Sequence, residues 1–64
     1  MKLRTNDMVF HGKTPVKLLW LAESRGNFDY WWVEKLFTQP QTLMLKFDRH
    51  KQYGRLHVKH TSAA

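Results

Sequence analysis

The chain has no cysteine, only three glycines and two prolines, and no long apolar run. Without cysteine, disulfides and thiolate metal sites are excluded, and a small cysteine-free chain fits a reducing compartment better than a secreted scaffold. No apolar segment approaches the roughly 20 residues that span a bilayer. No apolar stretch follows the basic start of the chain, as it would in a signal peptide. We therefore expect a cytoplasmic protein that does not enter a membrane.

Groups for catalysis and metal binding are also scarce. Five Asp and Glu stand among 64 residues, and none of them forms a close pair in sequence. A chain of this length makes one small domain, residues 1–64, which rarely encloses a substrate pocket within one subunit. His57 and His60 are three positions apart, which places them on opposite faces of a strand. We predict no enzyme, no catalytic or metal-ligating residues and no cofactor, and we expect residues 1–6 and 61–64 to fray.

Aromatic and β-branched residues are plentiful, with four Phe, three Trp and two Tyr in the chain. Such residues favour strands, and turn-forming residues separate the apolar segments. The pattern predicts five short strands, at residues 8–10, 16–23, 28–35, 42–48 and 55–60. The prediction is a mainly-β domain: a small five-stranded barrel that resembles the SH3-like architecture, or a strongly bent antiparallel sheet.

An α+β fold is the alternative, because residues 16–23 also carry helix signals. Thr14 would be the N-cap, Pro15 the first helical residue and Gly26 the residue just past the end. This version has one or two short helices within residues 15–37, followed by a C-terminal β-hairpin. The unbroken apolar run from Leu18 to Ala22 favours a buried strand instead.

The last third of the chain, residues 42–60, predicts a hairpin with one apolar and one cationic face. Leu43, Leu45 and Phe47 alternate with polar residues, and alternate side chains on a strand point to opposite faces. The chain has a net charge of +6 and a pI near 10.1, and the positive excess is concentrated here. A two-stranded cationic ribbon suits the phosphates of nucleic acid. The predicted nucleic-acid-binding residues are Lys46, Arg49, His50, Lys51, Tyr53, Arg55, His57 and Lys59.

The aromatic cluster at residues 28–33 has two faces. We expect Tyr30 and Trp32 to fill the core with Trp20 and Phe47, because aromatic side chains dominate small cores. Trp31 then faces solvent, and an exposed Trp beside apolar neighbours is typical of an interface anchor. The predicted protein-interface residues are Leu19, Leu21, Trp31 and Val33.

Two functions follow from these two surfaces. The first is a small nucleic-acid-binding protein, for DNA or RNA, with a regulatory or architectural role and a homodimer built through the apolar patch. The alternative is a protein-interaction module, such as an adaptor or inhibitor of the phage or mobile-element accessory type, that docks on a larger protein.

Overall fold

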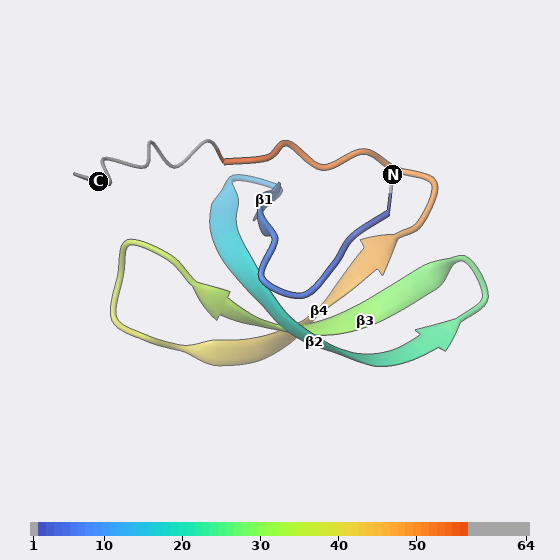
Figure 1. Ribbon diagram of the computed structural model, residues 1–64, viewed down its shortest axis with the longest axis horizontal. Coiled ribbons are helices and arrows are strands. Elements are labelled where there is room, and N and C mark those ends of the chain that lie inside the picture. Colours follow the sequence, from blue (N-terminus) through green and yellow to red (C-terminus); the bar gives the residue numbers. More distant parts are fainter. Residues whose placement is uncertain (1, 57–64) are drawn as a thin grey trace, which may run out of the picture.

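The computed structural model of the chain describes residues 2–56, which form one curled antiparallel sheet (Figure 1). Its strands are β1 (Met8–His11), β2 (Thr14–Arg25), β3 (Phe28–Lys35) and β4 (Thr42–Asp48), paired in the order β1-β2-β3-β4. The prediction of a mainly-β domain with a strongly bent sheet is confirmed. The α+β alternative is wrong, because residues 15–37 contain β2 and β3 and no helix.

Glycine forms both tight turns of the sheet. His11 pairs with Thr14 and Arg25 with Phe28, so each turn contains two residues. Gly12 and Gly26 come first in their turns, with φ of +67° and +59°. Glycine adopts positive φ without a steric penalty, and a positive φ at this position matches the twist of hairpin strands.

Two β-bulges bend β2 and change which of its side chains face the core. The register against β3 shifts between Leu18 and Trp20, and again between Leu21 and Glu23. Each shift adds one residue to β2, which bends the strand and interrupts the alternation of its faces. Leu18 therefore faces the core while Trp20 faces away from it. The 12-residue strand β2 is the longest of the four and curves through the middle of the sheet in Figure 1.

The core lies on the inner, concave face of the sheet. It consists of six buried side chains, Val9, Val16, Leu18, Trp31, Val33 and Phe47, none of which is more than 5% exposed. Leu3, Leu43, Leu45 and Tyr53 are partly buried and pack against it. The apolar face predicted for residues 43–47 is thus the core-facing side of β4.

Residues 54–56 pair with β1 and not with β4, so the predicted C-terminal hairpin is wrong as far as the described chain extends. Phe10 N donates to Gly54 O at 2.8 Å, and Leu56 N donates to Met8 O at 3.0 Å. Arg55 stands opposite Val9 in an antiparallel bridge. Alternation in a sequence identifies the faces of a strand but not its partner. Of the predicted fifth strand, residues 57–60 lie outside the described part of the chain.

The N-terminal segment differs from the frayed end that we expected. Leu3 packs against the core, Asn6 N donates to Leu18 O at 2.8 Å, and Leu18 N donates to Asp7 O at 2.8 Å. Residues 3–7 are therefore held by burial and by backbone hydrogen bonds. Residues 61–64 lie outside the described residues. Within residues 2–56, no helix is long and apolar enough to cross a membrane.

Candidate nucleic-acid interface

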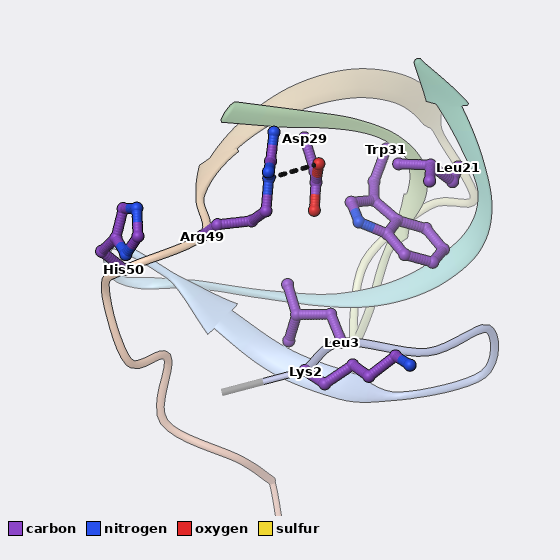
Figure 2. Close-up of a pocket in the computed structure, with 7 residues that line it drawn as sticks. All are labelled: Lys2, Leu3, Leu21, Asp29, Trp31, Arg49 and His50. Atoms are coloured by element: carbon purple, nitrogen blue, oxygen red, sulfur yellow. Dashed lines mark ion pairs between the residues drawn. The ribbon is translucent and has the colours of Figure 1, made fainter. Parts of the chain in front are cut away.

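Two segments cover the open side of the curled sheet, and together we call them the basic side: residues 2–7 and 49–56. In Figure 1 both run above the concave face of the strands. An ion pair joins them, with Arg55 Nη1 3.3 Å from Asp7 Oδ1. Lys2 and Leu3 from the first segment line the same pocket as Arg49 and His50 from the second (Figure 2). The fold thus brings the two ends of the described chain onto one surface.

Arg49 is held by the β2–β3 turn. Its Nε lies 3.0 Å from Asp29 Oδ1, its Nη2 donates to Gly26 O, and its backbone N donates to Asn27 O at 2.9 Å. Asp29 Oδ1 also accepts a hydrogen bond from Ser24 Oγ at 2.7 Å. The Arg49 side chain remains 46% exposed, whereas that of Asp29 is only 19% exposed. The carboxylate therefore orients the guanidinium while leaving much of it open to a ligand.

Arg55 has a similar arrangement on the other segment. The side chain of Arg55 is 43% exposed and that of its partner Asp7 is 19% exposed. Asp7 Oδ2 also accepts a hydrogen bond from the backbone N of Arg4 at 2.9 Å. The covered carboxylate again anchors a guanidinium that points partly into solvent.

Tyr53 has a structural role, which differs from the predicted one. Its hydroxyl accepts a hydrogen bond from Asp48 N at 2.9 Å, and its ring packs 5.0 Å from Phe47. His11 stacks on it with ring centroids 6.1 Å apart, and Lys51 Nζ lies 5.6 Å from the centroid of its ring. Tyr53 therefore closes the core between β1 and β4, and its stacking on a base stays a prediction.

Within the described part of the chain, the remaining predicted nucleic-acid residues do not form the expected ribbon. Lys46 lies on the opposite face of β4 from Phe47, with Nζ 4.5 Å from the centroid of the Phe28 ring. His50 is exposed at the turn after β4, next to Arg49. His57 and Lys59 lie outside the described residues. The structure thus brings Arg49, His50, Lys51 and Arg55 to the basic side, and it places Lys46 elsewhere.

The predicted protein interface is wrong in its orientation. Trp31 is 5% exposed and Val33 is fully buried, so both belong to the core. They stand opposite Leu45 and Leu43 of β4, and directly paired residues share a face of the sheet. Leu21 pairs with Trp31 on the inner face and is 44% exposed, whereas Leu19 is half-buried at the first bulge. These four residues do not form one solvent-facing patch.

The outer face of β2, β3 and β4, which points away from the core, carries the aromatic patch that the sequence did not place. Trp20, Trp32 and Met44 are aligned across the three strands, and Trp20 and Met44 are 53% and 46% exposed. Phe28 and Tyr30 are half-buried on the same face. The alternation of aromatic residues in β3 could have indicated this patch. It was not sufficient, because a β2 strand without bulges would direct Trp20 toward the core.

Charge divides between the two surfaces. By strand register, the described residues of the outer face include three cations and three carboxylates: Lys17, Arg25, Lys46, Glu23, Glu34 and Asp48. Its formal charge is therefore zero. The other charged residues of the described part are Lys2, Arg4, Lys13, Lys35, Arg49, Lys51 and Arg55, with Asp7 and Asp29. The positive excess of residues 2–56 thus lies entirely off the outer face. Of the seven Lys and Arg residues in this second group, five are on the basic side.

Among the described residues there is no group of three or more His, Asp and Glu side chains that could hold a metal ion. Comparison of the chain with protein-family models, with curated proteins and with solved structures gives no match.

Proposed function

We propose that this protein binds nucleic acid, DNA or RNA, through the basic side. The separation of charge is the observation that carries the proposal. A neutral outer face and a basic side with Lys2, Arg4, Arg49, Lys51 and Arg55 give the molecule one direction from which a polyanion is attracted. Phosphate contacts by such cations release counterions and supply most of the affinity in sequence-independent binding.

The geometry of the two arginines supports phosphate contact. Arg49 and Arg55 are each oriented by a largely covered carboxylate and keep close to half of their side-chain surface exposed. A pre-oriented guanidinium loses less side-chain freedom when it binds a phosphate oxygen than a fully mobile one does. The proposal assigns no base-specific contact and no preference for DNA over RNA.

A salt series with charge-matched variants tests this function. Binding of a labelled strand is measured by fluorescence anisotropy as the salt concentration rises. The logarithm of the binding constant should fall linearly with the logarithm of salt concentration. Arg4→Gln or Lys51→Gln should each make that slope shallower by roughly 0.7 to 0.9, the value for one lost phosphate contact.

Lys17→Gln is the matched control, because it removes the same charge from the outer face. It should leave the slope unchanged. An absence of binding at low salt, an affinity indifferent to salt, or an equal effect of the control variant would each refute the proposal.

The outer face favours a second function, binding of another protein. Trp20 and Met44 are exposed on either side of the half-buried Trp32 and form an apolar stripe with it in neutral surroundings, and exposed aromatic side chains are common anchors of protein interfaces. This surface is distinct from the basic side, so one molecule can use both. Self-association by gel filtration, and capture of a larger partner, should both be lost in Trp20→Ser combined with Met44→Ser if this face mediates them.

A further inference from the structure

A cavity of about 530 Å³ opens on the basic side, between the N-terminal segment, the turn after β4 and the inner face of the sheet (Figure 2). This volume lies within the range of pockets that bind small organic groups. Its lining has an apolar part, formed by Leu3, Leu21 and Trp31, and a charged part, formed by Lys2, Asp29, Arg49 and His50. It therefore combines surfaces for a flat apolar body with cations for an anion.

Leu21 gives the pocket an open apolar wall. Its partner across the sheet is Trp31, which is 5% exposed, but Leu21 itself is 44% exposed. An inner-face leucine with this exposure offers apolar surface to a ligand, because nothing in the described chain covers it fully. Removal of that surface from water would favour binding.

Trp31 contributes an unused hydrogen-bond donor. Its Nε1 is buried and has no acceptor among the described residues. Figure 2 shows this nitrogen on the side of the indole that faces Asp29 and Arg49. The Asp29 Oδ1 atom already accepts from Ser24 Oγ and pairs with Arg49 Nε. Buried polar groups normally have partners, but this N–H is covered by protein atoms, so a ligand in the pocket reaches it only if neighbouring side chains shift.

We propose that this pocket takes one unpaired nucleobase of a single-stranded nucleic acid, an inference that rests on the proposed nucleic-acid binding. A base has a flat apolar face for Leu3, Leu21 and the small exposed part of Trp31. Its sugar is attached to phosphate, which meets Lys2 and Arg49 at the pocket mouth. A paired base within a duplex is not available to such a pocket, so the protein prefers single strands.

Three probes of equal length test the inference: a single strand of about 12 nucleotides, the same strand with abasic sugars, and its duplex. The intact strand should bind roughly 5-fold to 150-fold more tightly than the abasic strand, the range expected for one stacked base. Because the abasic strand keeps every phosphate, its binding should show the same dependence on salt.

Two variants, at residues of similar exposure, test whether the preference for the intact strand arises in the pocket. Leu21→Trp adds a ring inside the pocket and should abolish the preference for the intact strand while leaving the salt-dependent binding. Met44→Trp adds the same ring on the outer face, where Met44 is 46% exposed, and should leave the preference unchanged. Circular dichroism verifies that each variant is folded. If Leu21→Trp does not fold, Leu21→Ala replaces it and should lower the preference.

The two proposals fail in different ways. Equal affinity for the intact and abasic strands, with a normal salt dependence, overturns the base pocket and leaves nucleic-acid binding in place. Absence of binding to all three probes at low salt overturns both. If Leu21→Trp keeps the preference for the intact strand, the base binds on another surface, and the proposal of a base-binding pocket is refuted.

Discussion

Trp20 of β2 and Trp32 of β3 pack against each other on the outer face of the sheet, with ring centroids 5.9 Å apart and ring planes inclined by 34°. Trp31, the next residue along the chain, is buried on the opposite face. The first bulge of β2 makes this pairing possible, because it turns Trp20 away from the side of Val16 and Leu18. The three tryptophans therefore have different roles in stability and binding.

Replacement of the buried and the exposed tryptophan should have unequal effects. Trp31→Ala should lower the free energy of unfolding by about 3–5 kcal/mol, because it leaves a cavity in the core. Trp20→Ala should lower it by about 0.5–1.5 kcal/mol, the range for an aromatic pair at the surface. Urea denaturation followed by circular dichroism measures both. Equal losses would contradict the assignment of inner and outer faces.

Replacement of either turn glycine by alanine should lower the stability of the protein, although the added methyl group would have free space. A Cβ atom built at Gly12 or Gly26 meets nothing within 4 Å, but both residues have positive φ. Alanine at either position should therefore reduce the free energy of unfolding by about 1–2 kcal/mol through backbone strain alone.

Gly54→Ala is the control for this prediction. A Cβ atom there would lie 3.6 Å from Phe10 Cδ2, an ordinary contact, and no positive φ is involved. Its free energy of unfolding, measured by the same urea denaturation, should stay the same or rise by up to about 1 kcal/mol, because the unfolded chain loses freedom. Similar losses in all three variants would contradict the account.

Removal of the Tyr53 hydroxyl should destabilise the closure of the sheet. Tyr53→Phe leaves the partly buried Asp48 N–H without its acceptor, which should cost about 1–3 kcal/mol. Tyr30→Phe removes the same atom from the outer face, where no hydrogen bond to that hydroxyl occurs within the described part of the chain. Thermal unfolding of the two variants should therefore show a lower midpoint for Tyr53→Phe alone.

Removal of one carboxylate from the basic side should increase affinity for nucleic acid. Asp7→Asn keeps an oxygen that can accept from Arg4 N but removes the charge that pairs with Arg55. Affinity for a single strand at low salt should rise, because the added positive charge outweighs the loss of the contact that orients Arg55. Stability should change by no more than about 1 kcal/mol, because the Arg55 side chain is 43% exposed. Glu34→Gln makes the same charge change on the outer face and should leave the affinity unaltered.

Local patterns were sufficient for most of the strands. Predicted strands 28–35 and 42–48 coincide with β3 and β4, and the turns at Gly12 and Gly26 fall in the gaps between the predicted strands 8–10, 16–23 and 28–35. Aromatic and β-branched residues, together with glycine at turn positions, act within a few residues of one another. For that reason, they can be read without knowledge of the tertiary structure.

Local sequence patterns could not decide which face of β3 points to the core. Phe28, Tyr30 and Trp32 on one side compete with Trp31 and Val33 on the other, and both sets are apolar enough to be buried. Pairing with β4 decides between them, because Leu43 and Leu45 face the core and stand opposite Val33 and Trp31. The predicted interface failed for this reason.

The sequence by itself determined the strands, their turns and the excess of positive charge, since these depend on neighbouring residues and on composition. Only the tertiary structure decided that residues 54–56 pair with β1, that Trp20 faces outward and that Lys2 and Arg49 share a pocket. Each of these depends on how far a bulged sheet curls and which distant segments it brings together, and no local pattern specifies that.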